Sequence, residues 1–154
     1  MQKIWCKKYP HYVVGKIFVG ALEVGWDQEF GGISYIVDIR GLPMMDTTVT
    51  AENKLWWPLS EALYATILAF ETTGENQYLE WCQKIWDYID EHLVDKKYGG
   101  DWYGYLRKDG TIFNRCKVNS KFFLSIFRNY SKKVITNFVY FRIFFVYGKV
   151  KSTN

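Results

Sequence analysis

The sequence predicts an all-α fold in which pairs of helices are joined by short β-hairpins. Two segments with helical periodicity lie between residues 58 and 93, and a short motif near residue 27 recurs near residue 95. Each copy of the motif is followed by aromatic or β-branched residues and then by a turn that contains glycine. Helices separated by hairpins of this kind indicate a repeated helical architecture.

The repeated motif predicts the two hairpins. Residues 27–32 read Asp-Gln-Glu-Phe-Gly-Gly, and residues 95–100 read Asp-Lys-Lys-Tyr-Gly-Gly. The first copy leads to a turn at residues 38–41 and the second to a turn at residues 108–110. Gly-Gly entry and a glycine at the closing turn are typical of β-hairpins.

Two helices are expected between the hairpins. The first spans residues 58–73, with Pro58 at its first position and Gly74 directly after its end. The second spans residues 76–93, with apolar residues at steps of three and four and charged residues on the opposite face. Each helix can bury its apolar face only against a neighbour.

A repeated unit of two helices and a hairpin is the building block of an (α/α) toroid. The chain holds about one and a half such units, and a closed ring of six needs roughly twice this length or more. We therefore expect a partial (α/α) toroid of the six-hairpin barrel type, with short β-hairpins between its helix pairs.

Composition and charge narrow the class of protein. The chain has 7 Trp, 12 Tyr and 11 Phe, which suits a carbohydrate site as well as a packed core. All acidic residues lie between Glu23 and Asp109, whereas residues 110–154 carry only basic charges. The apolar run at residues 134–147 is shorter than the ~20 residues of a membrane-spanning helix.

Cysteine and histidine usage argues against a metal site. Cys6, Cys82 and Cys116 show no Cys-x-x-Cys spacing, so we expect reduced thiols in a cytoplasmic protein. His11 and His92 do not lie at ligand spacing from a cysteine. No metal ligand is therefore predicted.

Three motifs in order carry a resemblance to a known family. They are residues 25–32 (Gly-Trp-Asp-Gln-Glu-Phe-Gly-Gly), 54–62 (Lys-Leu-Trp-Trp-Pro-Leu-Ser-Glu-Ala) and 98–106 (Tyr-Gly-Gly-Asp-Trp-Tyr-Gly-Tyr-Leu). The stretch 21–117 resembles the N-acylglucosamine 2-epimerase (renin-binding protein) family. The resemblance implies interconversion of N-acetylglucosamine and N-acetylmannosamine by removal and return of the C2 proton.

The resemblance also implies which ligand, cofactor and partners to expect. The expected ligand is a small amino sugar, with no cofactor, although nucleotide activation and a homodimer occur within the family. Neither nucleic acid nor a membrane is expected as a partner. Related families act on free hexoses or on cellobiose-type disaccharides, so the sequence leaves the sugar open.

The second motif supplies the candidate site. Glu61 is expected in the first turn of its helix, where the helix dipole favours a carboxylate, and is the candidate catalytic residue. Trp56 and Trp57, just before the helix, are candidate substrate-binding residues, together with Lys54. The alternative for Glu61 is a helix-end charge without a role in a site.

The acid–base pair implied by the family is missing. The family uses two histidines, one in a Pro-Gly-His motif and one in a Phe-His-Val-Pro-Arg motif, and neither motif occurs here. His11 and His92 do not match them, and Leu59 stands where the family often has histidine. The sequence thus predicts one wall of a sugar site in a truncated, inactive copy.

The chain divides into three parts. Residues 1–20 are expected to be a divergent segment without the helix of the family, residues 21–117 the partial domain, and residues 118–154 a basic aromatic tail. We interpret the tail as out-of-frame or intron-derived translation rather than as a binding segment. Two alternatives for the whole chain are a non-catalytic fragment that acts as an interaction partner and an (α/α) glycosidase-like protein, which would need two opposed carboxylic acids.

Overall fold

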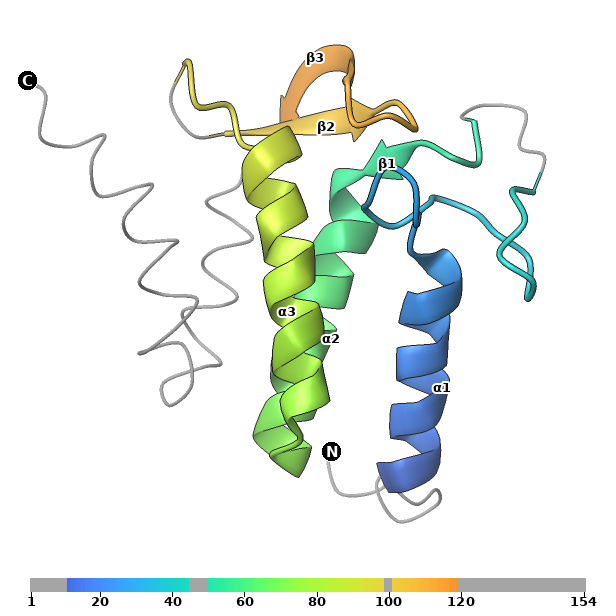
Figure 1. Cartoon of the computed structure of the whole chain (residues 1–154). Helices are drawn as coiled ribbons and strands as arrows, with labels where there is room; N and C mark the ends of the chain where they lie inside the picture. Colours follow the sequence, from blue (N-terminus) through green and yellow to red (C-terminus); the bar gives the residue numbers. More distant parts are fainter. Residues whose placement is uncertain (1–10, 45–49, 99–100, 119–154) are drawn as a thin grey trace, which may run out of the picture.

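The computed structural model describes residues 11–44, 50–98 and 101–118. Helices α1 (His11–Gly25), α2 (Trp56–Thr73) and α3 (Asn76–Tyr88) lie side by side, with a small sheet across one end (Figure 1). The sheet has the antiparallel order β1 (Lys54–Leu55), β2 (Trp102–Leu106), β3 (Ile112–Val118). The described part of the chain is therefore rich in helix, as the sequence predicts.

Helix α1 corrects one expectation. The first twenty residues were expected to lack a helix, but α1 begins at His11 and runs to Gly25. It packs against α3 through Phe18, whose ring stacks on that of Tyr78 at 6.2 Å between centroids. The remaining part of the expected N-terminal segment, residues 1–10, lies outside the described residues.

Helix α2 begins two residues earlier than predicted. Leu55 is extended, with φ −106° and ψ 145°, and Trp56 opens the helix, so Pro58 is its third residue rather than its first. Gly74 ends α2 as expected: its φ is 74° and its N–H donates to the Phe70 carbonyl at 2.8 Å. Buried hydroxyls on α2 are satisfied within the helix, because Thr66 Oγ1 donates to the Leu63 carbonyl at 2.8 Å.

The second predicted helix is present in two parts. Helix α3 ends at Tyr88 and continues as one wider turn, η2 (Ile89–Leu93). The apolar face of α3 and η2 supplies much of the core, which also includes residues from the other helices and from the sheet. Fully buried core residues include Leu59, Leu63, Ile85, Ile89, Leu93, Trp102 and Leu106. Within the described ranges, no helix has the length and apolar character needed to cross a membrane.

The second predicted hairpin is confirmed and the first is irregular. Strands β2 and β3 pair in antiparallel fashion with bulges near Tyr105. The first copy forms only isolated bridges, Trp26 with Ile33 and Val37 with Pro43. Strand β1, which pairs with β2 just before α2, was not predicted from the sequence because two residues show no periodicity.

The repeat is visible in the hydrogen bonds of the two aspartates. Asp27 Oδ1 accepts the N–H groups of Glu29 and Phe30 at 2.9 and 3.1 Å. Asp95 Oδ1 accepts those of Lys97 and Tyr98 at 2.9 and 3.0 Å. Each aspartate thus caps the same kind of turn. The Gly-Gly pair of the first copy is described, whereas Gly99 and Gly100 lie outside the described residues.

Candidate functional site

The candidate site residues of α2 lie in its first two turns. The Trp57 side chain is 46% exposed, and Glu61, four residues later, is exposed as well. Residues four apart occupy one face of a helix, so an indole and a carboxylate lie next to each other on the free face of α2. Trp56 differs: its side chain is partly buried and packs against the core.

The expectation that Glu61 lies in the first turn of its helix, where the helix dipole favours a carboxylate, is wrong. Because α2 begins at Trp56, Glu61 is its sixth residue, and the first turn of α2 carries no acidic residue. The influence of the helix dipole falls off within the first turn. Any role of Glu61 therefore depends on its place beside Trp57 and not on the end of the helix.

Lys54 is directed inward rather than toward the free face of α2. Its side chain is fully buried, and its Nζ donates to Asp27 Oδ2 at 2.7 Å and to Ser34 Oγ at 3.2 Å. Lys54, which was predicted to bind substrate, thus connects the start of α2 to residues 26–43, which we call the first hairpin segment. Asp27 belongs to the repeated motif, but nothing in the motif points to Lys54 as its partner.

The charges of the Asp27–Lys54 pair are balanced against burial. Burial raises the pKa of Asp27, but hydrogen bonds from Lys54 and from two backbone N–H groups outweigh it and hold this pKa below its usual value. Burial lowers the pKa of Lys54, and the hydrogen bond to Asp27 opposes that change. The net shift lowers both pKa values, and the 2.7 Å between Lys54 Nζ and Asp27 Oδ2 is the distance of an ion pair.

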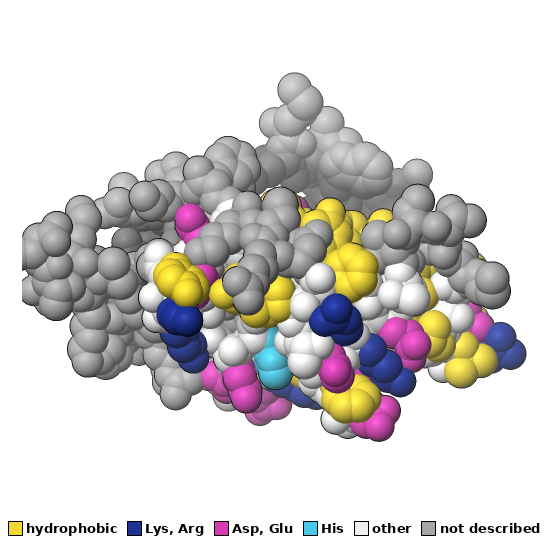
Figure 2. All heavy atoms as spheres, turned by 90° about the horizontal axis from the view of Figure 1, so that it is seen from above, with side chains coloured by type: hydrophobic (Ala, Val, Ile, Leu, Met, Phe, Trp, Pro, Cys, Tyr) yellow, Lys and Arg dark blue, Asp and Glu magenta, His cyan; other side chains and the backbone are white. Residues whose placement is uncertain are grey.

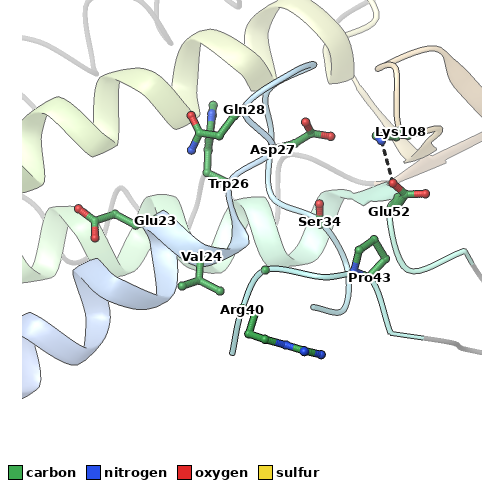
Figure 3. A pocket seen from close by; sticks show the side chains of 11 residues that line it. Glu23, Val24, Trp26, Asp27, Gln28, Ser34, Arg40, Pro43, Glu52 and Lys108 are labelled. Atoms are coloured by element: carbon green, nitrogen blue, oxygen red, sulfur yellow. Dashed lines mark ion pairs between the residues drawn. The ribbon is translucent and has the colours of Figure 1, made fainter. Parts of the chain in front are cut away.

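A pocket not predicted from the sequence lies between the end of α1 and the first hairpin segment (Figure 3). This pocket, which we call the first hollow, has a volume of about 510 Å³. Lys108 closes one side, since its Nζ lies 2.8 Å from Glu52 Oε1 and 3.6 Å from Glu29 Oε2. The other lining residues include Glu23, Val24, Trp26, Asp27, Gln28, Ser34, Arg40, Gly41 and Pro43.

A second hollow of about 550 Å³ occupies the equivalent place beside the second hairpin. Val24 and Gly41 line the first hollow, and their counterparts in the repeat, His92 and Gly110, line the second. In each case the glycine leaves room for the helix: a Cβ on Gly110 would lie 2.7 Å from His92 Nδ1. The repeat thus extends from the turns to the spaces beside them.

His92 belongs to this second hollow and not to the free face of α2. Its ring lies 4.5 Å from that of Tyr88, between centroids, in the last turn before β2. Figure 2 shows this end of the molecule, where acidic and basic side chains alternate with apolar ones. No single-sign patch large enough for a polyanion is visible on the described surface of that view.

The described residues hold no other obvious catalytic group. Cys82 is buried among core residues, and burial raises the pKa of its thiol to about 11, so it is not a nucleophile at neutral pH. Within the described ranges, no three His, Cys, Asp or Glu side chains are grouped so that they could hold a metal ion.

The known proteins match the part of the chain that holds the three motifs. The family model of N-acylglucosamine 2-epimerase (GlcNAc 2-epimerase) matches residues 13–124, beyond both ends of the resemblance seen in the sequence. N-acylglucosamine 2-epimerase from Bos taurus is 35% identical over 105 residues, which are 68% of this chain and 24% of that protein. The chain therefore spans about a quarter of this relative's length.

One further relative and one solved structure extend the comparison. Cellobiose 2-epimerase from Ruminococcus albus is 33% identical over 60 residues, which are 39% of this chain and 15% of that protein. The crystal structure of a D-mannose isomerase superposes with a TM-score of 0.59 at 21% identity, over 70% of this chain and 26% of the other. At that identity the superposition shows the fold alone. Because the family model covers more than half of the sequence, the chain belongs to the N-acylglucosamine 2-epimerase family.

Proposed function

We propose that the free face of α2 is one wall of a sugar-binding site in a sugar isomerase of the 2-epimerase type. The observation that carries this proposal is the large exposed indole of Trp57 with the Glu61 carboxylate one turn along the same face. An indole face covers the apolar C–H groups of a pyranose, and a carboxylate accepts hydrogen bonds from its hydroxyls. The names of the related proteins support a saccharide as ligand.

The exposed faces of α2 and α3 carry different kinds of residue, and this difference supports an (α/α) toroid around the proposed wall. The exposed face of α3 carries charged residues such as Glu80, Lys84 and Asp87, as expected for an outer helix. The exposed face of α2 instead carries Trp57 and, further along, Leu68, which is 46% exposed. We propose that α2 is an inner helix, whose apolar and aromatic face lines the lumen of a ring that this chain forms in part.

In a complete site of the 2-epimerase type, the chemistry is epimerisation at C2 of an open-chain amino sugar. A base removes the C2 proton and an acid returns one on the other face, which requires two groups on opposite sides of the same carbon. Glu61 can supply only one of these two groups. His92 cannot supply the other, because it lies in the second hollow. We therefore propose that this chain binds an amino sugar without turning it over, and that Glu61 orients hydroxyl groups.

A binding and turnover experiment tests this function. N-acetylglucosamine titrated into the protein should give saturation-transfer NMR signals, and Trp57→Ala should weaken binding by about tenfold, as loss of a central aromatic contact does. Phe113→Ala, which removes another half-exposed ring from β3, is the matched control and should leave binding unchanged. Equal binding by wild type and Trp57→Ala would refute the site, and N-acetylmannosamine formation above background would refute the lack of turnover.

A role as a non-catalytic interaction partner is the second candidate. The observation that favours it is the tip of the first hairpin segment, where Ile39 is 91% exposed and Leu42 and Met44 about half. Exposed apolar side chains that lie near one another in the chain are candidates for a contact with another protein. Absence of any sugar binding by the wild-type chain would favour this second role.

A further inference from the structure

Tyr35 lies beside the proposed sugar wall although no sequence motif pointed to it. Its ring is 6.0 Å from that of Trp57, between centroids, and the two planes are nearly perpendicular at 86°. The preceding residue, Ser34, lines the first hollow instead. The chain at Ser34 and Tyr35 therefore lies between the first hollow and the Trp57 ring.

The backbone around Tyr35 is held at several points. The Tyr35 N–H donates to the Asn53 carbonyl at 3.0 Å, and the Ile36 N–H donates to the Ala51 carbonyl at 3.1 Å. The buried ammonium of Lys54 also binds Ser34 Oγ. Tyr35 is thus fixed relative to the residues that lead directly into Trp57, and the perpendicular pair is set by the fold.

We propose that Tyr35 is a specificity-determining residue that contacts the N-acyl group of the sugar bound on Trp57. This inference rests on the proposed function, because it needs a pyranose on the indole face. Because the two ring planes are perpendicular, a sugar that covers the part of the indole not contacted by Tyr35 would bring its substituent against the Tyr35 ring. An acyl methyl is apolar and gains from contact with an aromatic ring, whereas the hydroxyl of a plain hexose at that carbon gains much less.

A structural role alone would have a different consequence. If Tyr35 only supported the Trp57 ring, its removal would weaken the binding of every sugar by the same factor. If Tyr35 contacts the N-acyl group, its removal lowers the affinity for N-acetylglucosamine more than the affinity for glucose. The ratio of the two dissociation constants therefore separates contact from support.

The experiment measures dissociation constants of the full chain for N-acetylglucosamine and glucose by NMR titration. The variants are Tyr35→Leu, which keeps apolar bulk without a ring, and Tyr35→Phe, which keeps the ring without the hydroxyl. Tyr35→Leu should weaken N-acetylglucosamine binding by about fivefold and glucose binding by less than twofold, within the range of one aromatic contact. Tyr35→Phe should keep the preference of the wild type. Circular dichroism should show the same helix content for all variants.

The outcomes distinguish this inference from the proposed function. If the wild type binds both sugars and Trp57→Ala weakens binding by about tenfold, but Tyr35→Leu weakens both equally or not at all, the inference is overturned and the proposed site stands. If Tyr35→Phe loses the preference as Tyr35→Leu does, the contact is made by the hydroxyl and the proposed ring contact is wrong. If the wild type binds neither sugar, both are overturned.

Discussion

Lys54→Met is expected to lower the free energy of unfolding by about 3–5 kcal/mol, the cost of removing one partner from a buried ion pair. The Lys54 side chain is fully buried and that of Asp27 is 10% exposed, so the remaining carboxylate would have little access to water. Lys54 belongs to β1, and methionine keeps most of the length of its side chain, so the loss reports the charge rather than a cavity. Urea unfolding followed by circular dichroism measures the change.

A matched control uses an exposed pair. Lys96 Nζ lies 3.1 Å from Asp90 Oδ2, with side chains 57% and 31% exposed, so Lys96→Met should cost less than about 1 kcal/mol. The double variant Asp27→Asn with Lys54→Met should regain part of the loss, because no charge is left buried. Equal costs for Lys54→Met and Lys96→Met would contradict the assignment of Lys54 to a buried structural pair.

Gly32→Ala is expected to destabilise the protein by about 2–5 kcal/mol. Gly32 has φ 75°, a left-handed conformation that costs an alanine roughly 1–2 kcal/mol. In addition, a Cβ at this position would lie 2.6 Å from the ring of Tyr88, which is itself buried against Trp26. Overpacking of this kind costs about 1–3 kcal/mol more. Thermal unfolding of the variant measures the sum.

Gly74→Ala separates the two contributions. Gly74 has almost the same φ, 74°, but no atom within 4 Å of an added Cβ, so only the backbone cost of roughly 1–2 kcal/mol should appear. Gly32→Ala should exceed it by the steric part, and Tyr88→Leu should reduce that excess. If the two glycine variants lost the same stability, the close approach of Gly32 to Tyr88 would have no energetic weight.

The helices could be predicted where periodicity and stop signals agree. Gly74 ends α2 at the predicted residue, because a glycine is favoured in the left-handed conformation that closes a helix. The start of α2 was misplaced, since Pro58 suits any position of the first turn and the indoles before it give no sign of a helix. Helix α1 was missed because Gly15 and Gly20 interrupt its pattern, although its packing on α3 stabilises it.

The site was predictable in part for a different reason. The second motif placed Trp57 and Glu61 together, and their spacing of four residues on a helix is enough to put them on one face. The same motif predicts Lys54 on this surface, because it directly precedes the indoles in the sequence. Its actual direction depends on Asp27 and Ser34, which are 27 and 20 residues away, and pairings of that separation are not encoded in any local pattern.

The central claim is that the free face of α2 beside Tyr35 binds an amino sugar. The most direct measurement is a ¹⁵N–¹H NMR titration of the full chain with N-acetylglucosamine, with the Trp57 indole assigned by its absence in Trp57→Phe. We expect the largest shifts at the Trp57 indole and the Glu61 amide, and smaller ones at Gln28 and Gly41 in the first hollow. Shifts concentrated in the first hollow, with Trp57 unchanged, would contradict the claim.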